Sequence, residues 1–258
     1  MFNSNNTYLY IKRFFDIFIS VFILIIFFPI IALGIFSVWV VDGGSPIYNA
    51  PRIGINGKKF TMYKIRTMVL NAEKSQIDTT SKDDSRILPV GFILRRFKID
   101  ELLQAINVLK GDMSLVGPRP NVDREVSIYT KVERNLLSVK PGITDFSSIV
   151  FSDLGAIMSK YEDTNVAYNQ LIRPWKSRLS LVYIEHRTLV LDIKILVCTV
   201  VSIFSHSMAR VLVQNILIGL GCDKKIITVA GREEVLKPYP PPGSKKIVTH
   251  RKDQHSNF

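Results

Sequence analysis

The chain carries an acidic pair, Asp100 and Glu101, in a setting that suggests chemistry. A carboxylate is ionised at neutral pH, so it can attack a phosphorus atom without a base or bind a divalent cation. Arg95 comes shortly before the pair and would offset the charge of an anionic substrate. A structural interpretation stays open, because carboxylates also stabilise the first turn of a helix.

Arg119 stands between Pro118 and Pro120, a short distance after the acidic pair. Each proline fixes its own φ angle and restricts the residue before it, so the arginine loses backbone freedom on both sides. A guanidinium held in this way suits bidentate contact with a phosphate. We therefore predict that Arg119 and its two prolines belong to a substrate-binding site.

A short amphipathic helix is predicted between the acidic pair and the Pro-Arg-Pro turn. Lys110 and Gly111 would end it, and the acidic pair would form its first turn. Its apolar residues recur at helical spacing, at Leu102, Leu103, Ile106 and Leu109.

A β-hairpin is predicted earlier in the chain, around Asn56 and Gly57, a dipeptide that favours type I′ turns. Residues 58–66 form its second strand, in which Lys64 and Arg66 would point to the same face. Both are candidates to bind substrate phosphate. Alternatively, they belong to a solvated edge of the hairpin.

Residues 17–41 contain no charged side chain. As one helix they would extend roughly 37 Å, which is enough to cross a bilayer. A single span is therefore one interpretation. A re-entrant helix is the other, because Pro29 interrupts the run and Lys12 and Arg13 precede it. A re-entrant helix would return the chain to the side on which these two cations lie.

The chain has 258 residues and a net charge of +12. Nucleic acid, an anionic membrane surface or a phosphorylated substrate could each explain this charge. Nucleic acid is excluded as a partner, since no nucleic-acid motif is present and the aromatic residues concentrate in the N-terminal apolar run. Cys198 and Cys222 have neither metal-site spacing nor a disulfide framework, which indicates a reducing environment.

These patterns predict a mixed α+β fold that is mostly helical. We divide it into an N-terminal membrane helix (1–45), a catalytic domain (46–205), a C-terminal amphipathic extension (206–236) and a basic, proline-rich, disordered tail (237–258). Residues 181–204 and 208–220 are amphipathic. They would lie in the lipid headgroup plane or pack against each other.

Residues 100–120 resemble the signature of bacterial sugar transferases that act on polyprenyl phosphate, the monotopic phosphoglycosyl transferases. The resemblance covers roughly residues 8 to 200, in the order of the family. Its supporting stretches are Lys12-Arg13, residues 52–58, residues 64–68, residues 140–144 and residues 183–199, which include Leu191-Asp192.

The resemblance implies a reaction in two steps. Asp100 would attack the β-phosphate of a UDP-sugar and release UMP. The sugar phosphate would then pass to undecaprenyl phosphate. A Mg²⁺ ion held partly by Glu101 would act together with Arg95, Arg119, Lys64 or Arg66 on the phosphoryl oxygens.

The resemblance further implies a re-entrant helix with Pro29 at its bend, which would dip into the lipid bilayer. The catalytic domain would lie on the cytoplasmic face of the bacterial inner membrane and begin the synthesis of a surface polysaccharide. N-acetylated hexosamines and their derivatives are the expected sugars.

The chain departs from the family pattern at three places near the site, one of which is Leu103, where a proline is common. Phe97-Lys98-Ile99 replaces the usual Thr-Ser-Leu, and Asp145-Phe146 stands where a glycine and a bulky residue are usual. Two other functions stay open. A noncatalytic membrane adaptor would keep its activity after Asp100→Asn, and a hydrolase would cleave UDP-sugars or lipid diphosphates without a lipid acceptor.

Overall fold

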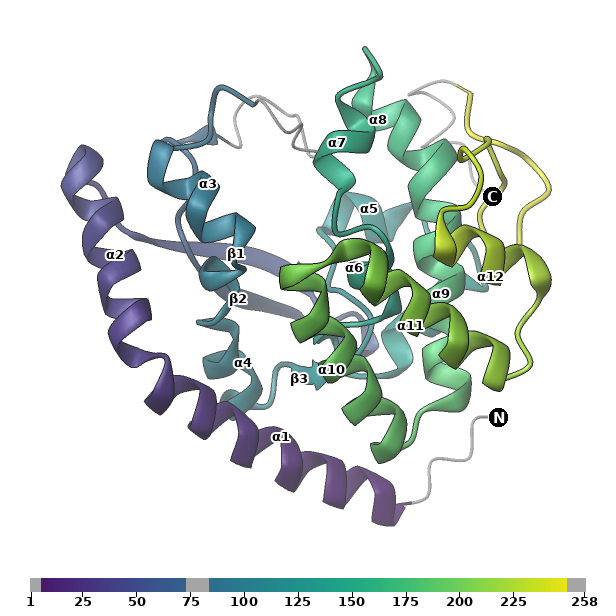
Figure 1. Ribbon diagram of the computed structural model, residues 1–258, viewed down its shortest axis with the longest axis horizontal. Coiled ribbons are helices and arrows are strands. Elements are labelled where there is room, and N and C mark those ends of the chain that lie inside the picture. The colour runs from purple at the N-terminus through teal and green to yellow at the C-terminus, as the bar shows by residue number, and fades with distance from the viewer. Residues whose placement is uncertain (1–5, 73–83, 250–258) are drawn as a thin grey trace.

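The computed structural model describes residues 6–72 and 84–249. Within these ranges the chain is mostly helical, with one antiparallel β-hairpin and one short parallel strand pair (Figure 1). The predicted mixed α+β class is therefore confirmed. The strands are β1 (Ile47–Ile53), β2 (Lys59–Ile65), β3 (Ser114–Val116) and β4 (Gly142–Thr144).

The longest helices lie at the N-terminal end of the described chain and within residues 173–219, and shorter ones lie between them (Figure 1). The helices are α1 (Asn6–Ile26), α2 (Phe28–Asp42), α3 (Pro89–Arg96), α4 (Gln104–Lys110), α5 (Asp123–Ser127), α6 (Phe146–Val150), α7 (Leu154–Met158), α8 (Thr164–Ala167), α9 (Arg173–His186), α10 (Leu189–Phe204), α11 (His206–Gly219) and α12 (Lys224–Gly231). Shorter helical turns are η1 (Ile55–Gly57), η3 (Ile99–Glu101), η4 (Glu133–Ser138) and the π-helical η5 (Tyr168–Ile172).

The N-terminal apolar run is bent. α1 and α2 meet at an angle of 62° around Phe27, and Pro29 lies in the first turn of α2, where its missing N–H breaks no helical hydrogen bond. No single helix in the described part of the chain has the length and apolar composition to cross a membrane, although the bent pair together does. The bend predicted at Pro29 is thus found two residues earlier, and entry into a bilayer stays a prediction.

The polar face of α1 is fastened to the body of the protein. The Lys12 ammonium lies 2.8 Å from a carboxylate oxygen of the buried Asp192 in α10. The Arg13 guanidinium donates to the carbonyl oxygens of Val108 and Leu109, at 2.6 and 2.9 Å. These carbonyls belong to the last turn of α4, where a cation also opposes the negative end of the helix dipole. The two predicted membrane-flanking cations therefore have partners within the protein.

The other face of α1 exposes large apolar side chains over its whole length. A surface of this size is uncommon on a soluble monomer and marks a contact with protein or lipid. Its most prominent members are Tyr10, Phe14, Phe18, Phe22 and Ile25.

The hairpin forms as predicted. β1 and β2 pair antiparallel, and the turn places Asn56 at φ 56° and Gly57 at φ 76°. Positive φ angles at both central residues are what a type I′ turn requires, and Asn and Gly tolerate them best. The pairing stops at Ile65, which lies opposite Ile47.

β3 and β4 form a parallel pair that fixes the chain on either side of the Pro-Arg-Pro turn. Gly117 and Gly142 lie so close at its end that a Cβ atom on Gly142 would come within 2.6 Å of three Gly117 atoms. Only glycine allows this approach. The Gly142 N–H then donates to the Pro118 carbonyl at 2.9 Å.

The C-terminal helices share one hydrophobic core with the rest of the body. α10 ends and α11 begins at the predicted boundary near residue 205, but α11 buries Ala209, Val213 and Leu217 in the same core as α9. The segment 206–236 is thus not a separate packing unit. α10 and α11 pack against each other, as one of the two interpretations expected, and α10 also exposes an apolar stripe at Val190, Ile193, Val197, Val200 and Phe204.

The prediction of a disordered tail is wrong for residues 237–249. Tyr239 stacks on Trp175 with ring centroids 4.5 Å apart, and Val248 is fully buried. The Val248 carbonyl also accepts a hydrogen bond from the Gln170 side chain at 2.7 Å. The prolines that suggested disorder instead favour an extended path over α9. Residues 250–258 of the predicted tail lie outside the described residues.

Candidate functional site

Asn107 in α4 fixes this helix against the hairpin. Its Oδ1 accepts from the Tyr63 N–H at 2.9 Å, and its Nδ2 donates to the Thr61 carbonyl at 2.7 Å. Asn107 is fully buried, so both bonds are shielded from water. They set the position of Lys64, the next residue of β2, relative to the chain that leads into α4.

The acidic pair lies in the turn η3, which precedes α4. The prediction that the pair forms the first turn of the helix is wrong in this detail, because α4 begins only at Gln104. Lys98, in the left-handed conformation with a φ of 55°, separates the end of α3 from η3. This conformation brings Arg95, in the last turn of α3, close enough for its charge to act on Asp100.

Glu101 is held by two cations. Its Oε1 accepts from Lys64 Nζ at 3.0 Å and from Arg119 Nη2, and its Oε2 accepts from Arg119 Nη1 at 3.1 Å. Burial would raise the pKa of Glu101, but the nearby Arg119 and Lys64 outweigh it and hold the pKa below its usual range. Glu101 is therefore a fixed anion that orients both cations.

The Pro-Arg-Pro turn directs Arg119 toward Glu101. Pro118 anchors the turn to Gly142 of β4, and the Arg119 guanidinium donates to the Ile143 carbonyl at 3.2 Å. Pro118 and Pro120 are both buried. The two segments that carry the family resemblance, 114–120 and 140–144, thus meet in space at this arginine.

Asp100 is buried next to Glu101 but has looser contacts. Its Oδ2 lies 3.9 Å from Lys64 Nζ, beyond hydrogen-bonding distance, and no closer charged partner exists among the described residues. Burial raises the pKa of Asp100 to about 6, against the opposing attraction of Lys64. The carboxylate is therefore ionised at neutral pH and weakly engaged, as a nucleophile requires.

Arg95 and Arg66, the other two predicted cations, have different surroundings. Arg95 Nε donates to the Thr67 hydroxyl at 2.8 Å, and the charge of Asp100 acts on it. Arg66 binds both carboxylate oxygens of Asp42, at 2.6 and 2.7 Å. The structure does not bring Arg66 to the acidic pair together with Lys64, because strand pairing ends at Ile65 and the alternation of faces ends with it.

Glu101 can offer a Mg²⁺ ion one remaining position. A carboxylate has about four lone-pair sites, and Lys64 and Arg119 use three of those on Glu101. Among the described residues no group of three or more His, Cys, Asp or Glu side chains could hold a metal. A magnesium ion often takes one or two carboxylates and completes its shell with phosphates and water, so the residues fit such a site.

Sequence reasoning did not assign a role to three further charged residues around Arg119. Burial and the charge of Arg119 lower the pKa of Lys98 and of Lys176. The charge of Asp145 attracts Arg119 and favours its charged form. Asp145 is fully buried, caps α6 and accepts from the Ser180 hydroxyl at 2.6 Å. The departures from the family pattern at positions 98 and 145 were the available signal for two of them, and nothing singled out Lys176.

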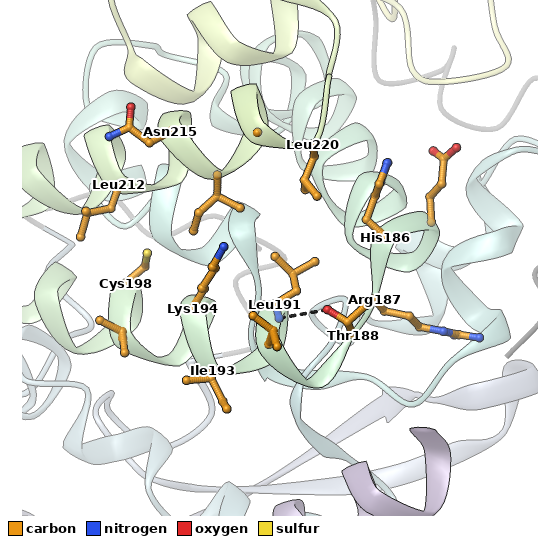
Figure 2. A pocket seen from close by; sticks show the side chains of 15 residues that line it. His186, Arg187, Thr188, Leu191, Ile193, Lys194, Cys198, Leu212, Asn215 and Leu220 are labelled. Carbon is orange, nitrogen blue, oxygen red and sulfur yellow. Dashed lines mark hydrogen bonds between the residues drawn. The ribbon is translucent and has the colours of Figure 1, made fainter. Parts of the chain in front are cut away.

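A large cavity lies elsewhere in the described part of the chain. It is an open, apolar groove of ≈ 840 Å³ between α10, α11 and the end of α9, and it contains none of the predicted catalytic or substrate-binding residues (Figure 2). The labelled side chains in Figure 2 that line it include Leu191, Ile193, Lys194 and Cys198 from α10, and Leu212 and Asn215 from α11.

A family model described as bacterial sugar transferase matches residues 7–206. Several curated proteins are also similar. The undecaprenyl-phosphate galactose phosphotransferase of Salmonella typhimurium is 41% identical over 150 residues, which cover 52% of this chain and 31% of that protein.

A second relative is the UDP-N-acetylgalactosamine-undecaprenyl-phosphate N-acetylgalactosaminephosphotransferase of Aeromonas hydrophila. It is 31% identical over 210 residues, which cover 79% of this chain and 46% of that protein. The exopolysaccharide production protein ExoY of Sinorhizobium fredii is 38% identical over 148 residues, covering 52% of this chain and 66% of that protein. The chain thus spans from about a third to two thirds of the length of these relatives.

Proposed function

The chain belongs to the bacterial sugar transferase family, and we propose that it transfers a sugar 1-phosphate from a UDP-sugar to undecaprenyl phosphate. The observation that carries this proposal is the unequal engagement of the acidic pair. Glu101 is tied to Arg119 and Lys64, whereas the adjacent Asp100 is buried beside these cations and has no hydrogen-bonding partner among the described residues. The names of two relatives support both substrates.

In the first step, an oxygen of Asp100 attacks the β-phosphorus of the UDP-sugar. A bond forms between that oxygen and phosphorus, and the bond from phosphorus to the bridging oxygen breaks. The electron pair leaves with UMP. Because both reactants are anions, the cations Arg95, Lys64 and Arg119 lower the barrier by neutralising the phosphoryl oxygens.

In the second step, a phosphate oxygen of undecaprenyl phosphate attacks the same phosphorus. The aspartyl ester bond breaks and the Asp100 carboxylate is regenerated, so atoms and charges balance without a proton transfer. Both displacements use the same cations. The product is a lipid-linked sugar diphosphate, which would begin a surface polysaccharide.

Glu101 supports this chemistry by holding Arg119 and Lys64 in place. A Mg²⁺ ion at its remaining oxygen position would add positive charge to the pyrophosphate. We propose such an ion as the cofactor. Removal of divalent cations with a chelator, followed by return of Mg²⁺, tests this requirement directly.

Membrane association would bring the enzyme to its lipid substrate. The exposed apolar faces of α1 and α10 support this, as does the bend between α1 and α2. We propose that the bent pair enters the bilayer as a re-entrant helix, with Lys12, Arg13 and the catalytic site at the cytoplasmic surface of the bacterial inner membrane. The galactose and N-acetylgalactosamine in the names of relatives make these the first sugars to test.

The test is nucleotide release by detergent-solubilised protein from a panel of UDP-sugars, with Mg²⁺, with and without undecaprenyl phosphate. We expect UMP release whose turnover needs the lipid and which Asp100→Asn abolishes. Turnover without lipid would support the hydrolase instead, and release of UDP would mean glycosyl transfer. An Asp100→Asn variant that retains every activity would return the protein to the adaptor class.

A further inference from the structure

Lys176 in α9 is a partly buried cation without an ion-pair partner among the described residues. Its ammonium lies 3.1 Å from the neutral hydroxyl of Tyr168 and 5.4 Å from the centre of the same ring. Glu125 and Asp145 are the carboxylates whose charges act on it, but in the described part of the chain no carboxylate oxygen lies within 4.0 Å of its nitrogen. Burial also lowers the pKa of Lys176.

An unpaired buried charge opposes folding, so its presence calls for an explanation. Another cation of the same helix does have a carboxylate partner. Arg173, one turn earlier, binds both oxygens of Glu133 and a backbone carbonyl. Lys176 thus differs from its neighbour in a way that a merely structural role does not explain.

A narrow cavity connects Lys176 with the catalytic region. Lys176, Tyr168 and Arg119 all line it, and Arg119 also binds Glu101 on the side of the acidic pair. Its volume of ≈ 20 Å³ is about that of one water-sized group. The cavity therefore has room for a phosphoryl oxygen beside Lys176.

We propose that Lys176 and Tyr168 form, together with Arg119, a second phosphate subsite that binds the phosphate of the departing nucleotide. This inference rests on the proposed function. In-line displacement places the leaving group opposite the attacking Asp100. Arg119 contacts Glu101 of the acidic pair and also lines the cavity that contains Lys176. The Arg119 guanidinium then contacts both phosphates of the pyrophosphate, while Lys176 stabilises the negative charge that develops on the departing nucleotide.

The test is binding of UMP and of uridine to the full-length, detergent-solubilised protein, measured by calorimetry with Mg²⁺. Lys176→Met should weaken UMP binding about 10- to 100-fold, the range expected for loss of a charge-assisted hydrogen bond, and leave uridine binding unchanged. Lys176→Arg should restore most of the affinity. Tyr168→Phe should have a smaller effect, because it removes only the hydroxyl. Lys224→Met, which removes an exposed lysine of α12, is the matched control for net charge.

The melting temperature of each variant separates binding from structure. Lys176→Met should melt no lower than the native protein, since it removes a partly buried charge that has no ion-pair partner among the described residues. Equal UMP binding by Lys176→Met and the native chain would overturn the subsite alone. A native chain that binds neither UMP nor any UDP-sugar would overturn the proposed function, and the subsite with it.

Discussion

Arg173 and Arg119 each hold a glutamate inside the protein, but the two pairs lie in different surroundings. The two charges of the Arg173 pair match each other, and their remaining polar atoms have partners of their own. Its guanidinium contacts Glu133 at 2.6 and 3.1 Å, and Glu133 also accepts from the Ser177 hydroxyl and the Thr130 N–H, at 2.8 and 3.0 Å. This closed cluster ties α9 to η4.

The Arg119 cluster is open by comparison. Glu101 accepts from Arg119 and Lys64, while the nearby Lys98 and Lys176 have no carboxylate within ion-pair distance among the described residues. The cluster therefore has an excess of positive charge. A buried ion pair whose polar atoms all have partners indicates a structural role. An ion pair that lies among unpaired cations instead indicates a site for an anionic substrate.

The largest expected effect is on the open cluster. Asp100→Asn should reduce UMP release by at least about 10⁴-fold, because the amide is not a nucleophile. The variant should melt no lower than the native protein, since the raised pKa of Asp100 means that its charge destabilises the folded state at neutral pH. A thermal scan beside the assay checks both. A large loss of stability would place Asp100 among the structural residues.

The next effect concerns the closed cluster. Arg173→Met should lower the free energy of unfolding by about 3–5 kcal/mol, because it leaves Glu133 buried and unpaired. Urea unfolding followed by tryptophan fluorescence measures this. Adding Glu133→Gln should recover part of the loss. If the folded Arg173→Met variant lost activity but no stability, the contrast between the two arginines would fail.

Arg119→Met should show the reverse pattern. We expect kcat/KM to fall about 10²–10³-fold, the usual effect of removing one donor to a developing anion, with a much smaller loss of stability than in Arg173→Met. Arg119→Lys should recover little, because a lysine cannot reproduce the two contacts with Glu101. Steady-state kinetics with the best UDP-sugar tests this prediction, and full activity of the lysine variant would contradict it.

The pH profile is expected to show a smaller effect. Because burial raises the pKa of Asp100 to about 6, its carboxylate is mostly ionised at pH 7 and mostly protonated at pH 5. kcat/KM should therefore fall about tenfold between these values as pH decreases. A profile that stays flat down to pH 5 would rule out a nucleophile with this pKa.

Asp42→Asn should have the smallest effect. It weakens the contact of Asp42 with Arg66, which joins the end of α2 to the chain after β2. The melting temperature should fall slightly, and kcat/KM should change less than about threefold. A kinetic effect as large as that of Arg119→Met would bring Arg66 back into the substrate-binding site.

Local features of the sequence predict the hairpin, the family and the candidate site. Asn56-Gly57 specified the hairpin turn because few other residues tolerate two positive φ angles. The acidic pair and the Pro-Arg-Pro turn carry the family resemblance and indicate the candidate site, because they form a motif contiguous in the chain. Pro29 indicates a bend in the N-terminal apolar run through its local effect on the backbone. These features need no knowledge of distant contacts.

Which charges meet depends on the packing of segments that are distant in the chain. Lys64 and Arg66 look equivalent in the sequence, yet one lies on Glu101 and the other on Asp42, because β2 stops between them. Likewise, Lys176 lies far from Arg119 along the chain, and packing alone places both on one cavity. Residues 237–249 are a further case, because their prolines predict disorder whereas packing stacks Tyr239 on Trp175. Pairing between distant segments depends on where strands end and helices pack, which local patterns do not encode.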